Sequence, residues 1–138
     1  MVSYSDGSTI AQLSDPDMKL PIAYALAFPD RHPIPYGGID WSKAGRLDFE
    51  PPDLEAFPCL SLAFEAGRAG GTAPAWLSAA NEVAVDAFLD SRLGWADIST
   101  VIASTMDEYD GRPADSLSAV LDADAAARQV TEKTINSQ

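Results

Sequence analysis

The sequence contains a single cysteine, Cys59, among its 138 residues. One thiol excludes an internal disulfide and any cysteine-rich metal site, and it fits a reducing compartment. No apolar run approaches the roughly 20 residues that a membrane-spanning helix needs. The first residues also show neither the basic nor the apolar region of a secretory signal. These absences predict a cytoplasmic protein with no membrane partner.

Basic residues are scarce as well, with 9 Lys and Arg against 21 Asp and Glu and a formal net charge of −12. Binding to a nucleic-acid backbone or an anionic lipid surface depends on clustered cations, so this charge balance excludes both partner classes. Hydrophobic residues make up 46% of the chain, which is typical of a globular protein rather than a disordered one. The length suits one domain, or one small domain with an appendage.

Residue types suited to catalysis are few. The only histidine, His32, lies between Arg31 and Pro33, where a surface position is favoured over a general base or metal ligand. Cys59 has no basic neighbour in sequence, which favours a buried inert thiol over a nucleophile. Asp15 and Asp17 flank Pro16, and we interpret them as capping residues rather than a metal pair.

Polar and aromatic residues within the predicted helices favour structural roles. Asn81 is expected to be partly buried and to tie its helix to a neighbouring loop, because a buried amide needs hydrogen-bond partners. The three tryptophans, Trp41, Trp76 and Trp95, are too dispersed for a stacking platform and are expected to fill the core. Residue chemistry alone therefore reveals no active site.

The N-terminal residues have the pattern of a β-hairpin followed by a helix. Apolar and polar residues alternate on both sides of Asp6-Gly7, a dipeptide typical of tight hairpin turns. An isolated hairpin is only marginally stable, so the pair predicts partner strands that the rest of the sequence does not supply. A helix is expected from Met18 to Phe28, ended by Pro29.

Between residues 29 and 58 lie six of the ten prolines, which disfavours both helix and central strand. We expect a long connector that is semi-rigid where proline is dense. Its apolar residues are too many for a solvated linker and predict that it is strapped onto a neighbouring surface. They are Ile39, Trp41, Leu47 and Phe49.

From Pro58 onward the apolar residues recur with helical spacing. Leu60, Ala63 and Phe64 predict a first helix, and a second follows Thr72 with Trp76 on its apolar stripe. A third helix is expected over residues 97–108, a short turn over 116–121 and a final helix over 124–135. The fold class is therefore α+β: an N-terminal β-hairpin, a Pro-rich connector and a C-terminal bundle of three to four helices.

Several different short motifs follow one another along essentially the whole chain. In chain order they are Asp6-Gly7-Ser8, Ala11-Gln12-Leu13, Pro16-Asp17-Met18-Lys19 with Pro21-Ile22, Leu47-Asp48-Phe49-Glu50-Pro51, Phe57-Pro58-Cys59-Leu60, and Ala79-Ala80-Asn81-Glu82-Val83-Ala84 with Ala87-Phe88-Leu89. Each is modest alone, but the ordered set resembles the C-terminal third of the 1-deoxy-D-xylulose 5-phosphate reductoisomerase family.

That resemblance implies a division of the chain into three parts. Residues 1–29 would end the connective and catalytic domain, residues 30–53 would form a linker strap, and residues 54–138 would form the C-terminal helical domain. The hairpin would be the remnant of a sheet that also forms a homodimer interface. The NADPH domain and the carboxylates that bind a divalent metal, Mg or Mn, would precede Met1.

The resemblance places one piece of the active site in this sequence. Pro16 and Met18 would line the wall of the substrate and cofactor pocket, with no catalytic or metal-binding residue among the 138. The alternative for Met18 is a core position. The implied activity is NADPH-dependent conversion of a ketose phosphate to 2-C-methyl-D-erythritol 4-phosphate in isoprenoid precursor biosynthesis, with the chain inactive alone. The other hypothesis is a free-standing acidic helical interaction module without catalytic activity, pairing through its hairpin edge.

Overall fold

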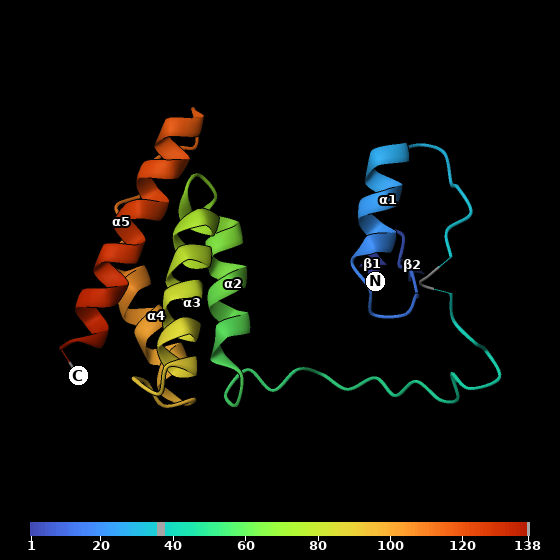
Figure 1. Ribbon diagram of the computed structural model, residues 1–138, viewed down its shortest axis with the longest axis horizontal. Coiled ribbons are helices and arrows are strands. Elements are labelled where there is room, and N and C mark those ends of the chain that lie inside the picture. Colours follow the sequence, from blue (N-terminus) through green and yellow to red (C-terminus); the bar gives the residue numbers. More distant parts are fainter. Residues whose placement is uncertain (36–37, 138) are drawn as a thin grey trace. The chain divides into compact units, whose positions relative to one another are not determined.

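The computed structural model describes residues 1–35 and 38–137, so residues 36 and 37 of the predicted connector lie outside it. The chain divides into two units, Met1–Glu50 and Pro51–Gln138, and each is described by itself. The described residues form two short strands and five helices (Figure 1). These are β1 (Val2–Ser3), β2 (Thr9–Ile10), α1 (Lys19–Ala27), α2 (Pro58–Ala69), α3 (Ala73–Leu89), α4 (Asp97–Asp107) and α5 (Leu117–Ile135).

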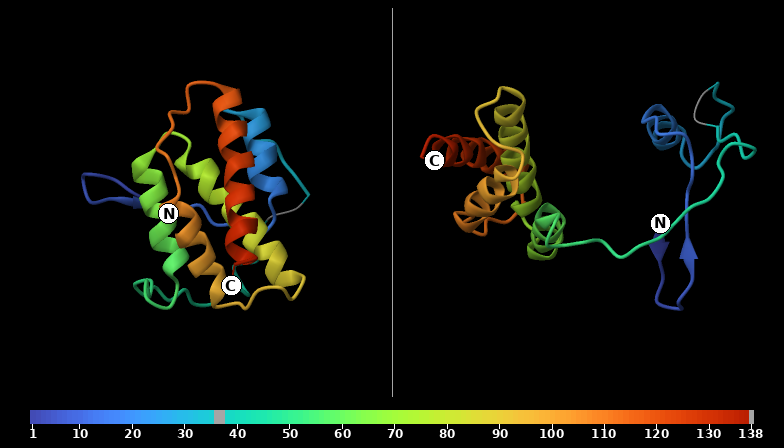
Figure 2. Two further views of the ribbon diagram at one scale, coloured as in Figure 1. Left: turned by 90° about the vertical axis from the view of Figure 1, so that its left-hand side faces the viewer. Right: turned by 90° about the horizontal axis from the view of Figure 1, so that it is seen from below.

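The predicted hairpin is present, although its strands are shorter than the alternating pattern suggested. β1 and β2 pair antiparallel, with Val2 opposite Ile10, and Figure 2 shows them as two arrows joined by a turn. Gly7 has a φ of +87°, which glycine adopts without strain. The Asp6 carboxylate closes the turn by accepting hydrogen bonds from the Ser8 N–H (2.8 Å) and hydroxyl (2.7 Å).

The first unit has no core of its own. None of its described residues is buried, and α1 buries no residue. Large apolar side chains are exposed throughout it, including Met18, Leu26 and Phe28. The connector residues Trp41 and Phe49 are exposed too, so their packing onto a neighbouring surface stays a prediction. Two-residue strands and one nine-residue helix offer too little area to form a core.

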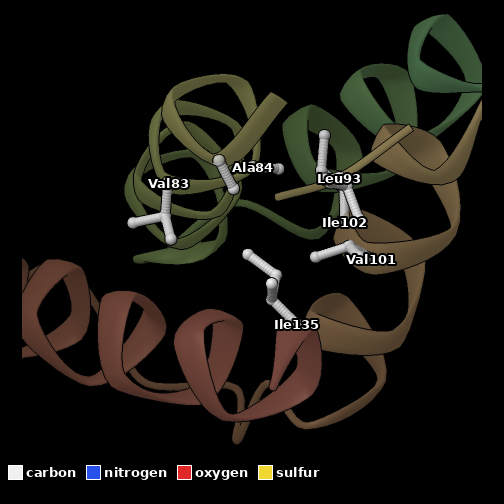
Figure 3. Close-up of a cluster of buried hydrophobic side chains, with 7 residues drawn as sticks. Val83, Ala84, Leu93, Val101, Ile102 and Ile135 are labelled. Carbon is white, nitrogen blue, oxygen red and sulfur yellow. The ribbon is translucent and has the colours of Figure 1, made fainter. Parts of the chain in front are cut away.

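The second unit is a four-helix bundle in which α3 packs against α2, α4 and α5 (Figure 1). One core cluster joins the C-terminal half of α3 to α4 and the end of α5, and its side chains point toward one another (Figure 3). It comprises Val83, Ala84, Ala87, Leu93, Val101, Ile102 and Ile135. The second cluster, Trp76, Ala79, Ala123 and Ala127, lies between α3 and α5, where alanine lets the helices approach closely.

The final helix differs from the prediction. The sequence suggested a short turn over 116–121 and a separate helix from 124, but α5 runs continuously from Leu117 to Ile135. Ser116 caps it by accepting a 3.1 Å hydrogen bond from the Ala119 N–H. Asp124, taken as a starting residue, is instead paired within the helix with Arg128 at 2.8 Å.

The second helix of the chain also orients differently from the expected pattern. α2 begins at Pro58 as predicted, but Leu60 and Phe64, two of the residues that predicted it, are exposed. Leu62 instead packs against the core and Ala66 is buried. The periodicity indicated a helix correctly, but α2 is apolar on two sides, so the pattern could not say which side packs against α3.

The prediction that all three tryptophans fill the core is wrong for two of them. Trp76 is buried, whereas Trp41 and Trp95 are exposed. Trp76 lies on the α3 stripe and has a partner for its indole N–H, while the other two lie in connecting segments that no helix covers.

Candidate functional site

The segment before α1 is shaped by its own hydrogen bonds. The Asp17 N–H donates to the Asp15 carbonyl at 2.7 Å, which bends the backbone sharply around Pro16. The Asp17 carboxylate then accepts a 2.9 Å hydrogen bond from the Lys19 N–H and lies 3.3 Å from Lys19 Nζ. Met18 occupies the N-cap position of α1 without a side-chain cap, so the predicted capping role of the two aspartates is wrong: Asp17 forms a local turn with the Lys19 N–H, and Asp15 contributes its carbonyl.

These contacts fix the backbone on both sides of Met18. Its carbonyl accepts a 3.2 Å hydrogen bond from the Ile22 N–H in the first turn of α1. Its side chain is 69% exposed, so within this chain Met18 does not occupy a core position. Pro16 is exposed as well. A turn that holds its backbone while presenting apolar side chains outward is suited to contact with another surface or a ligand.

Pro16 and Met18 lie on the rim of one open hollow with a volume of about 450 Å³. Its lining combines apolar and polar side chains, namely Gln12, Leu13, Ser14, Asp15, Pro16, Asp17, Met18 and Pro21. The structure thus brings together the two residues singled out from the sequence. It adds Gln12, Leu13 and Pro21, which lie in motifs that carried the family resemblance without being assigned a role.

The other candidates from the sequence lie elsewhere. His32 is exposed, as expected for a surface histidine. Cys59 is exposed, so the expectation of a buried thiol is wrong, because open hollows remain beside the first turn of α2, where it faces α3 and α4. Across residues 1–35 and 38–137, no group of three or more His, Cys, Asp or Glu side chains is placed to hold a metal ion. The described residues therefore do not fit a divalent metal, and we derive no step through one.

Asn81 does not have the predicted structural role. Its side chain is exposed and makes no hydrogen bond within the part of the chain that the structure describes. The following residue, Glu82, ties α3 to α5 through a 2.5 Å ion pair with Arg128. The sequence analysis missed Arg128, although Asp124 four residues earlier was a signal for an intrahelical pair.

Among the residues that the structure describes, two carboxyl groups have lowered pKa values, and both lie in turns outside the hollow. Hydrogen bonds from the Ser8 hydroxyl and then the Ser8 N–H hold the pKa of Asp6 below its usual value. The Ser42 hydroxyl, and then Lys43, lower the pKa of Asp40. Each carboxylate organises its own turn, which is a structural role rather than a catalytic one.

The chain contains a bundle of four helices. In the sequence, this bundle follows a two-stranded sheet and the segment that lines the open hollow. The sequence model of the family described as "DXP reductoisomerase C-terminal domain" matches residues 13–130. The chain belongs to this family. In the described residues, no helix is long and apolar enough to span a membrane.

Individual relatives agree with the family match. The chain is 51% identical over 137 residues to 1-deoxy-D-xylulose 5-phosphate reductoisomerase of Cupriavidus metallidurans, a match that covers 99% of this chain and 35% of the relative. The enzyme of the same name from Ralstonia pickettii is 54% identical over 135 residues, covering 98% of this chain and 34% of the relative. The chain thus spans about a third of the length of these relatives.

Solved structures show the same relationship. The Zymomonas mobilis reductoisomerase in complex with NADPH has a TM-score of 0.83 and 43% identity, covering all of this chain and 36% of that one. A DOX-P reductoisomerase in complex with NADPH, fosmidomycin and magnesium has a TM-score of 0.79 and 37% identity, covering 97% of this chain and 35% of that one.

Proposed function

We propose that this chain is the C-terminal part of an NADPH-dependent reductoisomerase, inactive by itself. The complete enzyme would convert 1-deoxy-D-xylulose 5-phosphate to 2-C-methyl-D-erythritol 4-phosphate in isoprenoid precursor biosynthesis in the cytoplasm. The observation that carries the proposal is the match over 99% of the chain to a relative of that name at 51% identity. The open hollow beside α1, lined by exposed apolar side chains, is consistent with a site that other elements complete.

Within this function, Pro16 and Met18 form part of the pocket wall near the substrate and the nicotinamide. A thioether side chain suits this role because it is flexible and polarisable and adapts to the shape of its partner. Asp17 keeps the wall in place by fixing the first turn of α1. NADPH and magnesium are present in the structural neighbours, and in this enzyme residues outside the present chain would bind both.

The first unit has a second proposed role, in assembly. Both strands of the hairpin are exposed, and paired strands need a larger sheet or a covering layer to be stable. We assign residues 1–29 to the end of the connective and catalytic domain, where the hairpin joins the sheet of a homodimer. Residues 30–53 would be the linker strap and residues 54–138 the helical domain.

An activity measurement tests this function. The upstream two thirds of the Cupriavidus metallidurans relative would be joined to this chain at the start of the match, and NADPH oxidation followed after addition of 1-deoxy-D-xylulose 5-phosphate and magnesium. Turnover is expected from the joined protein and from neither part alone. Turnover by the 138-residue chain alone, or none from a folded joined protein, would refute the proposal.

The second candidate is a free-standing acidic interaction module that pairs with another chain through its hairpin. The absence of buried residues in the described part of the first unit fits this alternative as well as the enzyme, since that unit needs a partner in either case. Reading the coding sequence upstream of Met1 distinguishes the two. A continuous frame encoding a nucleotide-binding fold supports the enzyme, and a stop codon before the start site supports the module.

A further inference from the structure

A second hollow of the first unit lies between α1 and the residues that follow it, and we call it the Arg31 hollow. Its volume is about 210 Å³, which is smaller than the pockets that hold drug-sized ligands. It is lined by Leu20, Ala23, Tyr24, Arg31, His32 and Ile34. The four of these that are not basic are half-buried, although no described residue of this unit is fully buried. α1 and the start of the connector therefore form a largely apolar wall here.

Arg31 lines this hollow with its guanidinium held on an aromatic ring. The central carbon of the guanidinium lies 4.1 Å from the centroid of the Tyr24 ring, which is a cation–π contact. A guanidinium stacked on a ring keeps its planar set of N–H donors available at its edges. Within residues 1–35 and 38–137, the Arg31 side chain makes no ion pair and no hydrogen bond. Tyr24 thus positions a cation whose donors are unused.

An unpaired arginine is uncommon in this chain. At least six of the nine Lys and Arg residues have a carboxylate partner. They are Lys19, Lys43, Arg46, Arg92, Arg112 and Arg128. Beside Arg31, the exposed imidazole of His32 lines the same hollow and offers a further N–H donor. Two neighbouring residues therefore bring nitrogen donors to one apolar hollow, and no carboxylate side chain lines it.

We propose that the Arg31 hollow binds the phosphate group of a small organic phosphate. A guanidinium pairs with two phosphate oxygens at once, and a phosphate group has a third oxygen for the His32 imidazole. A carboxylate has only two oxygens, so it would pair with Arg31 and leave His32 without a partner. The apolar part of the ligand would lie against Leu20 and Ile34. The inference goes beyond the proposed function, because this hollow shares no lining residue with the one near Met18.

The net charge of −12 weakens anion binding to this chain but does not exclude it at this place. Charges in solvent are screened over about 8 Å at physiological salt, so the groups nearest to the hollow have the largest effect. The nearest carboxylate in the sequence belongs to Asp30, which is exposed and does not line the hollow. Because exposed ion pairs in water are weak, we expect a dissociation constant in the millimolar range.

NMR of the only histidine tests the proposal. The imidazole signals of His32 would be followed in the 138-residue chain during titration with inorganic phosphate and with n-butyl phosphate, at constant pH and ionic strength. We expect saturable shifts with both, and tighter binding of butyl phosphate because its chain meets the apolar wall. Arg31→Gln should weaken binding roughly tenfold, as expected for the loss of a charge-assisted hydrogen bond.

The matched control is Arg68→Gln. Arg68 also lies over a ring, 5.6 Å from the Phe64 centroid, but does not line this hollow. This substitution should leave the affinity unchanged. Shifts that do not saturate, or equal weakening by the two substitutions, would overturn the proposal. Butyrate that binds as tightly as butyl phosphate would overturn the assignment of the hollow to a phosphate.

The joined protein described above tests whether the Arg31 hollow is open in the longer protein. With only the 138 residues isotope-labelled, the His32 signals should respond to butyl phosphate with the same affinity. No response there would contradict the proposal, because the preceding residues would then cover the hollow. NADPH turnover is measured separately and tests the proposed function alone, so the failure of one is distinguished from the failure of the other.

Discussion

Trp76 Nε1 on α3 donates a 2.8 Å hydrogen bond to the Thr105 carbonyl on α4, and both residues are buried. The indole ring also packs against Tyr109, with ring centroids 5.7 Å apart. Thr105 in turn donates a 3.3 Å hydrogen bond from its hydroxyl to the hydroxyl of Thr131 on α5. Three helices are therefore linked through one buried polar path in a core that is otherwise largely apolar.

Replacing Trp76 with Phe should lower the free energy of unfolding by about 1–3 kcal/mol, because the Thr105 carbonyl loses its indole donor and a cavity forms. Urea unfolding followed by circular dichroism measures the change. Trp41→Phe is the matched control and should leave the transition unchanged, since Trp41 is exposed. Equal effects of the two substitutions would show that the Trp76 contact does not stabilise the bundle.

Gly71→Ala should destabilise the bundle by about 1–3 kcal/mol. Gly71 has a φ of +55°, and an added Cβ would lie 2.6 Å from the Arg112 carbonyl oxygen. That oxygen already accepts hydrogen bonds from the Thr72 N–H (3.0 Å) and the Tyr109 hydroxyl (3.0 Å), so it cannot move easily.

Gly67→Ala is the matched control for this glycine. It lies inside α2 with nothing within 4 Å of its added Cβ. The substitution should stabilise the bundle by up to about 1 kcal/mol through helix propensity. Thermal melts of both variants should therefore shift in opposite directions. A shift of the same sign and size for both would contradict the description of the turn at Gly71.

Glu82→Gln should lower the melting temperature slightly at low salt, because it removes one of two carboxylates around Arg128. Nη2 of that arginine lies 2.5 Å from Glu82, and its Nε lies 2.8 Å from Asp124. The difference should disappear near 1 M salt, since exposed ion pairs are screened. Asp86→Gln, on the same solvent-exposed face of α3, is the control. A difference that persists at high salt would mean that Glu82 acts through packing.

The Asp6 carboxyl should titrate below the usual aspartate pKa of 3.8, because Ser8 hydrogen bonds stabilise its charged form. Its folded pKa is lowered, so its contribution to hairpin stability is present above pH 3.8 and is lost as the pH falls through the folded value. NMR titration of wild type and Ser8→Ala measures this. The variant's midpoint should move up toward 3.8; unchanged midpoints would exclude the Ser8 contact.

Local patterns predicted the hairpin and most of the helices, because those depend on neighbouring residues, although they divided α5 into a turn and a shorter helix. Asp6-Gly7 forms the turn, and Pro58 begins α2. Burial was harder to predict because it depends on the partner of each face. The spacing of Leu60 and Phe64 is the same whether their side of the helix meets α3 or faces solvent. Ion pairs between helices, such as Glu82 with Arg128, depend on which helix faces meet. The spacing of residues along the sequence does not predict this.

For the site, the family resemblance suggests a pocket wall that the residue chemistry does not, and this assignment stays a prediction. Pro16 and Met18 have no titratable group and no spacing rule, so physical reasoning alone would have left them in a turn. The structure places both on one hollow and adds Asp17 as the residue that fixes the backbone there. The remaining walls of such a pocket cannot be derived from these residues.

The most direct test of this account is the kcat/KM for 1-deoxy-D-xylulose 5-phosphate in the joined protein carrying Met18→Ala. If Met18 lines the substrate pocket, kcat/KM should fall about tenfold, as expected for removing a partly buried apolar contact. Leu26→Ala, an exposed position on the same helix, should leave it unchanged. Wild-type kcat/KM in the Met18→Ala protein, or an equal loss in both variants, would contradict the assignment of this segment to the active site.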